Sequence, residues 1–308
     1  MNRISDLCTV IVPTFFPGKE IFNNLNSIPP ELKILIIDNS YNLSLKKKIS
    51  KYKNCDYYNI GDVGLGKTFN FALSKIKTPY ILLTQPDVIL RNNCIANLIS
   101  GFDKYQNAGM VVPLVYDNNV YSKYDFYDLK YSKKKKIFLT PPKKNKISVL
   151  PSGDFCVDAV NATTMLIKVE ALKKINGWDE SYYVYLEDID ICLRLKLNNY
   201  SIIKIANAEV DHLGWSSHYS EIKNTMNISR IWHFTWSSLY FEDKFCRRSI
   251  LLKKLIKITF ISLLKLLLNL IILRFSKVNQ NFIKLSACAA FIFKRGSYFR
   301  VKHEMKKK

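Results

Sequence analysis

The sequence predicts an α/β fold with a mostly parallel, twisted sheet and helices on both faces, followed by a basic amphipathic helical region. Two observations carry this prediction. Between about residues 9 and 205, short runs rich in Ile, Val and Leu alternate with stretches of helical periodicity, which is typical of alternating strands and helices. Beyond residue 245 the chain is apolar but interrupted by lysines, which indicates helices with one polar side.

The predicted strands are short and rich in β-branched residues, and proline or glycine marks the turns between elements. The runs with strand character are residues 9–12, 32–37, 56–60, 80–84, 109–115 and 200–205. The stretches with helical character are residues 21–28, 45–53, 67–76, 93–104 and 168–175. Strands joined through single helices in this way are usually parallel neighbours.

Polar residues directly follow three of the predicted strands. Asp38 ends the second strand, residues 61–67 form a glycine-rich turn after the third, and Asp87 follows the fourth. In open sheets of this kind, ligands bind beyond the carboxyl ends of the strands. We therefore expect these three strand ends to converge on one crevice.

An acidic hexapeptide from Tyr185 to Asp190 (YLEDID) places Glu187, Asp188 and Asp190 among apolar neighbours. Carboxylates repel one another and are costly to bury unless a cation or a proton-transfer role accompanies them. A helix is predicted to begin near Asp188, where backbone N–H groups favour negative charge. An ordinary acidic helix cap is the alternative interpretation.

The turn from Gly61 to Thr68 (GDVGLGKT) matches the phosphate-loop pattern GxxxxGK[ST]. A nucleoside triphosphatase is therefore one hypothesis, although the preceding strand is polar and other strands come before it. A flexible turn is the second hypothesis. In the third, the glycines let the backbone approach a diphosphate and Lys67 offsets its charge. Loss of ATP hydrolysis in a Lys67→Ala variant would support the first.

The net charge of +22 is concentrated toward the C-terminus, where residues 245–308 hold sixteen Lys and Arg against the single acid Glu304. Such a charge favours an anionic partner: phospholipid, a phosphorylated substrate or nucleic acid. Long aliphatic runs interrupt the basic tail, and no nucleic-acid-binding module is recognisable. We keep a basic nucleic-acid-binding protein only as an alternative and expect no nucleic-acid partner.

We expect two parts, a catalytic domain over residues 1–240 and a membrane-associating tail over residues 241–308. Residues 117–146 are polar and basic and are interpreted as an insertion or loop. Lysines in residues 250–273 gather on about a third of a helical circumference, which favours a helix lying in the membrane surface over one that spans it. A second such helix is predicted over residues 282–293. A helical pair packed on the catalytic domain or on a second subunit is the alternative.

The seven cysteines are scattered, without a CxxC pair or zinc-ligand spacing, and are interpreted as reduced thiols. The apolar run after the N-terminus is too short for a secretory signal. We expect a cytoplasmic protein held at the inner face of the cell membrane.

A series of short motifs, spread from about Thr9 to Trp215, resembles the inverting family 2 glycosyltransferases, particularly their rhamnosyltransferase-like bacterial branch. The motifs are VIVPTF from Val10, IDNS from Ile37, NIG from Asn59 with residues 66–70, QPDV from Gln85, GWDE from Gly177, the acidic hexapeptide, and HLGW from His212. Each motif is weak alone, but their order and spacing together are specific.

The resemblance implies a GT-A fold, a nucleotide-sugar donor and a divalent metal, Mg²⁺ or Mn²⁺. It implies a site for the donor formed by Pro13, Thr14, Asp38, Asn59, Gly61, Lys67, Asn70 and Gln85. Asp87 and His212 would bind the metal or the diphosphate, and Asp188 would be the catalytic base. Gln85 stands where the family usually has Asn or Asp, so metal affinity is expected to be lower.

Trp178, Glu187 and Trp215 are the residues we expect beside the acceptor. Core packing is the alternative for the two tryptophans, and an ordinary strand-end hydrogen bond is the alternative for His212. Glu187 and Asp190 are also expected to support Asp188 or to pair with Arg194.

Sugar transfer from a nucleotide diphosphate requires groups that this pattern supplies. Charge developing on the leaving diphosphate must be stabilised by a cation or basic groups. The acceptor hydroxyl must lose a proton to a base, and water must be excluded. The resemblance, together with the basic tail, implies an enzyme that transfers a sugar from dTDP-rhamnose or a UDP-sugar to a lipid-linked glycan in bacterial surface polysaccharide (O-antigen) synthesis.

Overall fold

The computed structural model describes residues 3–117, 119–122, 126–129, 131–132, 137–138, 143–144, 151–214 and 223–300. The chain divides into two compact units. We call them the sheet unit (Met1–Asp128, Lys143–Glu180 and Asp188–Tyr219) and the helical unit (Leu129–Pro142, Ser181–Glu187 and Ser220–Lys308).

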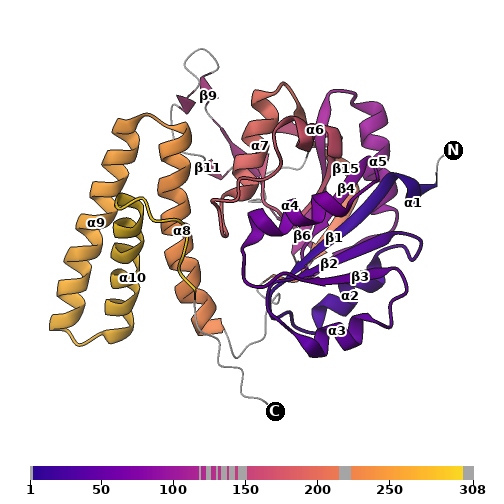
Figure 1. Cartoon of the computed structure of the whole chain (residues 1–308). Coiled ribbons are helices and arrows are strands. Elements are labelled where there is room, and N and C mark those ends of the chain that lie inside the picture. Colours follow the sequence, from indigo (N-terminus) through magenta and orange to yellow (C-terminus); the bar gives the residue numbers. More distant parts are fainter. Residues whose placement is uncertain are drawn as a thin grey trace. The chain divides into compact units, whose positions relative to one another are not determined.

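A single large sheet organises the sheet unit (Figure 1). Its strands follow the order β12 (Phe155–Val157), β15 (Ser201–His212), β6 (Ala108–Asp117), β14 (Thr164–Lys168), β4 (Tyr80–Thr84), β1 (Cys8–Thr14), β2 (Lys33–Asp38) and β3 (Cys55–Asn59). The short strands β5 (Val88–Leu90) and β7 (Val120–Tyr121) pair with β15 and β6. A separate sheet of the same unit joins β8 (Phe126–Asp128) to β11 (Lys143–Lys144) and β13 (Ala159–Val160).

The six predicted strands are all present, but the sheet is mixed rather than mostly parallel. β1 is parallel to β2 and β4, β2 to β3, and β6 to β15. β14 is inserted antiparallel between β4 and β6. The sequence showed β14 only as an apolar stretch, because a fully buried strand has no alternation that reveals its direction.

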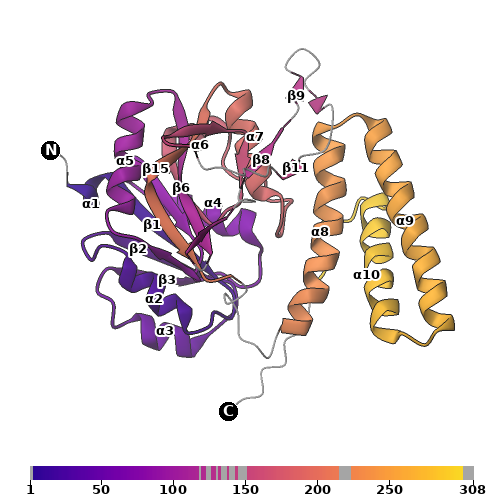
Figure 2. The ribbon, with the colours of Figure 1, turned by 180° about the vertical axis from the view of Figure 1, so that it is seen from behind.

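Helices cover both faces of this sheet, as opposite views show (Figure 2). Val10 and Val12 lie in one core cluster with residues of α2 (Glu20–Ser27), α3 (Leu43–Ile49) and α5 (Cys94–Lys104). The intervening Ile11 is also buried, and it points to the opposite face because side chains alternate along a strand. α4 (Leu65–Lys75) packs near β1 and β2. The remaining helices of the unit are α1 (Ile4–Leu7), α6 (Val169–Lys174) and most of α7 (Glu187–Leu197).

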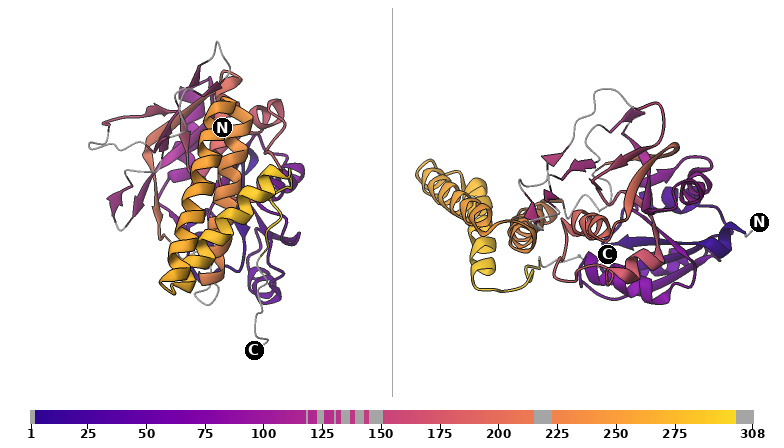
Figure 3. Two further views of the ribbon diagram at one scale, coloured as in Figure 1. Left: turned by 90° about the vertical axis from the view of Figure 1, so that its left-hand side faces the viewer. Right: turned by 90° about the horizontal axis from the view of Figure 1, so that it is seen from above.

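The helical unit is built on three helices that lie side by side, α8 (Lys223–Phe245), α9 (Arg248–Ile271) and α10 (Phe275–Ile292) (Figure 3). Trp232 and Trp236 of α8 pack with Ile283 and Ala287 of α10. This core includes residues of α8, and α8 as a whole lies in the helical unit. The boundary at residue 241 that the sequence suggested falls within this helix. The small hairpin of β9 (Tyr131–Ser132) and β10 (Ile137–Phe138) also belongs to it.

The predicted amphipathic segments correspond to α9 and α10. Large apolar side chains of α9 are exposed at helical spacing: Leu252, Ile256, Phe260, Leu263, Leu267 and Leu270. Among the described residues, we find no helix whose length and apolar character would let it cross a membrane.

Candidate active site

Asp38 lies buried at the end of β2 and connects the ends of three parallel strands. Thr14 of β1 and Asn59 of β3 are its neighbours in register. Its carboxylate accepts hydrogen bonds from Thr14 Oγ1 (3.0 Å), Tyr57 Oη (2.6 Å) and Asn59 Nδ2 (3.1 Å). It also accepts from the backbone N–H and hydroxyl of Ser40 (3.1 and 2.6 Å) and from Asn42 N–H (3.0 Å).

The glycine-rich turn continues from this cluster into α4. Gly61 N–H donates to Asn59 Oδ1 at 3.2 Å, and the φ of Gly61 is +73°. The positive φ favours glycine at this position. A Cβ would also lie 2.5 Å from Oη of the exposed Tyr41, a side chain that can move aside. Lys67 is exposed in the first turn of α4. Its ammonium and the N–H groups of that turn suit an anionic ligand.

The turn differs from a phosphate loop at Thr68. In a phosphate loop this hydroxyl binds Mg²⁺. Here Thr68 is buried, and its hydroxyl donates to Gly64 O at 2.7 Å and lies 3.0 Å from Asn39 Oδ1. The preceding strand β3 is at the end of the strand order. The geometry therefore disfavours the triphosphatase hypothesis.

Asp87 and His212 meet through strand pairing. Val88 of β5 pairs with His212 of β15, and Leu213 N–H donates to Asp87 O at 2.9 Å. His212 Nε2 lies 3.6 Å from Oδ2 of Asp87, whose side chain is buried. Two ligands bound to one ion at about 2.0–2.2 Å lie roughly 3–4 Å apart, so the pair fits a shared cation. Within the described part of the chain, no group of three or more His, Cys, Asp or Glu is arranged to hold a metal.

Asp188, the predicted base, is linked to the Asp87 turn by the loop between β13 and β14. Ala162 N–H donates to Asp188 Oδ2 at 3.0 Å. The next residue, Thr163, accepts at its carbonyl from Gln85 N–H at 3.1 Å. Two consecutive residues therefore contact the base and the turn that carries Asp87, which brings the two predicted centres to the same edge of the sheet. This loop is short and carries no recognisable motif, so the sequence gave no sign that Ala162 and Thr163 link Asp188 to the Asp87 turn.

Asn70 and Trp178 have structural roles. Asn70 Nδ2 donates to Trp178 O and Glu180 Oε1, both at 2.9 Å, and Asn70 Oδ1 accepts from Trp178 N–H at 2.9 Å. Trp178 is only 3% exposed, and its ring packs on Phe69. These contacts favour structural roles, because the amide is used by the protein and the ring is in the core. Donor binding by Asn70 and acceptor binding by Trp178 stay predictions.

The other predicted residues are placed as follows. Pro13 is half-buried in β1, and Glu187 is buried in the helical unit. Asp190 pairs with Arg194 (2.5 Å), as the sequence suggested. Trp215 lies outside the described residues, as does much of the predicted insertion.

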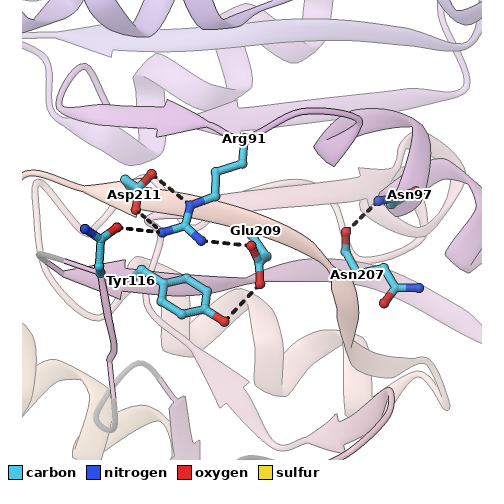
Figure 4. A network of polar contacts seen from close by, with 7 residues as sticks. Arg91, Asn97, Tyr116, Asn207, Glu209 and Asp211 are labelled. Carbon is cyan, nitrogen blue, oxygen red and sulfur yellow. Dashed lines mark hydrogen bonds and ion pairs between the residues drawn. The ribbon is translucent and has the colours of Figure 1, made fainter.

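An ion-pair network beside His212 had not been expected from the sequence (Figure 4). Arg91, just after β5, donates from Nε and Nη2 to Asp211 at 2.9 and 2.6 Å, and from Nη1 to Glu209 at 2.9 Å. Its guanidinium lies 4.3 Å from the ring centroid of Tyr116, whose hydroxyl donates to Glu209 at 2.9 Å. The network fastens β5 to β15 and so keeps His212 beside Asp87. Arg91 is separated in sequence from Glu209 by 118 residues and from Asp211 by 120. The sequence therefore gives no local signal of this network.

The mixed sheet, with acidic and imidazole groups at the carboxyl ends of its strands, is that of a GT-A glycosyltransferase. Solved structures agree in fold. The mannosyltransferase PcManGT from Pyrobaculum calidifontis, described in complex with GDP-Man and Mn²⁺, matches with a TM-score of 0.55 and 13% identity over 93% of this chain and 87% of its own. GalNAc-T7, described with UDP, GalNAc and Mn²⁺, matches with a TM-score of 0.56 and 14% identity over 72% of this chain and 48% of its own. The chain thus spans about half the length of GalNAc-T7.

Sequence comparison points to one family. Residues 9–159 match the model for glycosyl transferase family 2. The rhamnosyltransferase WbbL of Escherichia coli (strain K12) is 27% identical over 241 residues, covering 73% of this chain and 88% of the relative. The chain therefore resembles glycosyl transferase family 2 over residues 9–159 and a rhamnosyltransferase over most of its length. These matches confirm the resemblance seen in the motifs and favour glycosyl transfer over the triphosphatase and nucleic-acid-binding alternatives.

Proposed function

We propose that the protein is an inverting glycosyltransferase that moves a sugar from a nucleotide diphosphate to a hydroxyl group of a lipid-linked glycan in bacterial surface polysaccharide synthesis. The similarity to a rhamnosyltransferase supports dTDP-rhamnose as the first donor to test, with UDP-sugars as the alternative. The observation that carries the proposal is the bridge from Asp188 through Ala162 and Thr163 to the Gln85–Asp87 turn.

In this proposal, the edge formed by the ends of β1, β2 and β3 holds the nucleotide. Asp38 shapes the pocket by fixing Thr14, Asn59 and the turn at Ser40. The first turn of α4, with Lys67, faces the negative charge of the diphosphate. Polar and charged groups fixed before the reaction stabilise charge that develops on the leaving group without a cost of reorganisation.

Asp188 acts as the base in this proposal. The Ala162 N–H orients Oδ2, and Oδ1 accepts from the N–H of Ile189 at 2.8 Å. A carboxylate held in this way takes the proton of the acceptor hydroxyl as that oxygen attacks the anomeric carbon. Direct attack opposite the leaving diphosphate inverts the configuration at this carbon. Glu187 and Trp215 remain our proposed acceptor residues.

Asp87 and His212 are the residues that would hold a divalent cation. When bound, such a cation neutralises charge on the diphosphate. A carboxylate suits Mg²⁺ and Mn²⁺, and the imidazole favours Mn²⁺. Both solved relatives are described with Mn²⁺ and a nucleotide or nucleotide sugar. With only two protein ligands, the donor diphosphate and water would complete the coordination.

We also propose that the helical unit binds an anionic membrane surface. The exposed apolar strip of α9 is flanked by the exposed Lys253, Lys257 and Lys265. Neither α9 nor α10 contains an acidic residue, so pairing of this face with a second copy would bring like charges together. An anionic membrane surface suits both the apolar strip and the lysines, because the apolar side chains would enter the acyl boundary and the lysines would lie at lipid phosphates.

A thermal-shift screen of sugar nucleotides with and without Mn²⁺ tests the donor site, followed by a transfer assay with the donors that bind. The proposal predicts that one dTDP- or UDP-sugar raises Tm, with a larger rise when Mn²⁺ is present. Stabilisation by ATP and ATP hydrolysis, without stabilisation by any sugar nucleotide, would contradict it.

A further inference from the structure

The segment immediately before Asp188 has an unusual backbone. Tyr185 and Leu186 have φ values of +70° and +67°. Two consecutive residues with side chains seldom adopt the left-handed region, because Cβ crowds the following carbonyl oxygen. Such a conformation persists only where surrounding contacts fix it, and it often marks a functional site.

Contacts from α8 fix this segment, which belongs to the helical unit. Ser237 Oγ donates to the carbonyl of Val184 at 2.9 Å. Arg230 Nε donates to Tyr185 Oη at 3.1 Å, and the rings of Tyr185 and Phe234 meet edge-on with centroids 6.0 Å apart. These contacts hold Val184 and Tyr185, the first of the two left-handed residues.

The preceding residues are held by α8 and by the chain after α10. The ring of Tyr183 stacks on His233 at 4.3 Å, and the Arg300 guanidinium lies 3.7 Å from the centre of the same ring. His233 is itself bonded to Ser297 Oγ (2.8 Å) and the Phe299 carbonyl (2.9 Å). The part of the helical unit farthest along the sequence therefore contributes to the path of the chain toward Asp188.

We propose that the helical unit positions the catalytic base, with Ser237 and Arg230 as positioning residues. Ala162 orients the Asp188 carboxylate, while α8 sets the backbone path by which the chain reaches that residue. Misplacement of a reacting group by about 1 Å can lower a rate about 10²-fold. This inference rests on the proposed role of Asp188 and gives the C-terminal helices a catalytic purpose in addition to membrane binding.

Adjacent serines on α8 provide the test. Ser237→Ala removes the hydrogen bond to Val184 O, whereas Ser238→Ala removes a hydroxyl that donates to Thr235 O of its own helix at 2.9 Å. Hydrogen–deuterium exchange is measured on the full-length proteins. We expect the amides of residues 183–188 to exchange about fivefold faster in Ser237→Ala and Arg230→Met. Ser238→Ala is expected to match the wild type.

Kinetics then separates positioning from general stability. In Ser237→Ala we expect kcat to fall about tenfold with the KM for the donor unchanged, and Ser237→Thr, which keeps the hydroxyl, to recover most of it. Equal exchange and equal kcat in Ser237→Ala and Ser238→Ala would overturn the inference while leaving the proposed function intact. A wild-type protein without transferase activity would instead refute the proposed function. Faster exchange in the Ser237 variant would still show that α8 holds the segment.

Discussion

Asp38 illustrates how a buried acidic residue can organise the ends of several strands at a proposed binding site. Its two oxygens accept six hydrogen bonds from Thr14, Ser40, Asn42, Tyr57 and Asn59. A carboxylate has about four lone-pair positions, so this network uses its capacity. Burial and the hydrogen bond to Asp38 raise the pKa of the Tyr57 hydroxyl, which keeps it a donor at neutral pH. Asp38 therefore holds together the carboxyl ends of β1, β2 and β3 through hydrogen bonds.

Replacing Asp38 by Ala should destabilise the protein by roughly 2–5 kcal/mol, because buried donors lose their charged acceptor. Denaturation with urea measures this change. Asp56→Ala is the matched control, since the Asp56 side chain is 43% exposed and pairs at 2.7 Å with the exposed Lys33. A change below about 1 kcal/mol is expected there. Equal losses in the two variants would refute the assigned role.

Residue roles within the site were only partly accessible from the sequence. Asp87, His212 and Asp188 were recognised from motif order, and the structure brings them to one edge of the sheet. Asn70 and Trp178 belong to the same motifs, but they pair with each other over 108 residues. A motif records that a residue type recurs, and it does not distinguish ligand contact from support of the loop that makes the contact.

At the level of elements, the pairing of β5 with β15 determines the geometry of Asp87 and His212. The bidentate contact of Arg91 with Asp211 lies one residue from His212. Its geometry requires a planar guanidinium, which a lysine could not replace. We regard this network as the support of the proposed metal site, in the way that partners of ligands tune other metal centres.

Arg91→Met should therefore raise the Mn²⁺ concentration needed for half-maximal transfer by about tenfold. The measurement is a titration of transferase activity with Mn²⁺. Lys104→Met removes another ion pair of the same unit, that with Asp154, and serves as the control. An unchanged Mn²⁺ requirement in Arg91→Met would show that β5 is held in place by other contacts.

Within α8, His233 makes the stability of the helical unit depend on pH. Burial, together with the nearby Arg300 charge, lowers the pKa of His233 to about 3 from an ordinary value of 6.5. Between these values the unfolded chain binds the proton and the folded chain does not, so stability falls as pH falls below 6.5. The limiting slope is about 1.4 kcal/mol per pH unit.

His233→Gln should reduce this slope. The dependence of the unfolding free energy on pH is measured by urea denaturation between pH 7.5 and 5, with tryptophan fluorescence as the signal. We expect the wild type to lose more stability over this range than the variant, by on the order of 1 kcal/mol. Parallel pH profiles of the two proteins would argue against a buried neutral imidazole.

Strands and helices were predictable because their signals are local. Apolar runs bounded by turns gave β1, β2 and β4, and helical periodicity gave α5 and α9. The direction of β14 and the extent of α8 could not be predicted, since each depends on packing partners far away in sequence. The mean hydropathy of a segment does not identify its neighbour, and the core that Trp232 and Trp236 share with α10 appears only once the chain has folded.

At the scale of the whole molecule, charge and chemistry are divided between two units. The sheet unit carries the acidic and imidazole groups of the proposed site. The helical unit carries most of the excess positive charge and the exposed apolar strip of α9. Since residues Ser181–Glu187 belong to the helical unit and Asp188 to the sheet unit, the unit proposed to bind the membrane and the proposed base are joined by consecutive residues.

The combined substitution of Ile256, Phe260 and Leu267 by Gln should weaken binding to vesicles with anionic lipid. Ile256 and Phe260 are 67% and 60% exposed, so the folded core is little affected. Each fully buried side chain of this kind contributes about 1.5–3 kcal/mol, and a loss of at least about tenfold in partitioning is expected. Co-sedimentation measures it, with Leu43→Gln and Val120→Gln, exposed apolar residues of the sheet unit, as controls. Undiminished sedimentation would contradict a lipid-facing α9.

The central claim is that Asp188 removes the acceptor proton at a donor site organised by Asp38 and Asp87. The most direct test is the transfer rate of Asp188→Asn with a donor that the wild type uses, alongside calorimetric binding of the corresponding nucleoside diphosphate. A rate lower by about 10²- to 10⁴-fold with unchanged nucleotide binding is predicted. Transfer at the wild-type rate would contradict the account.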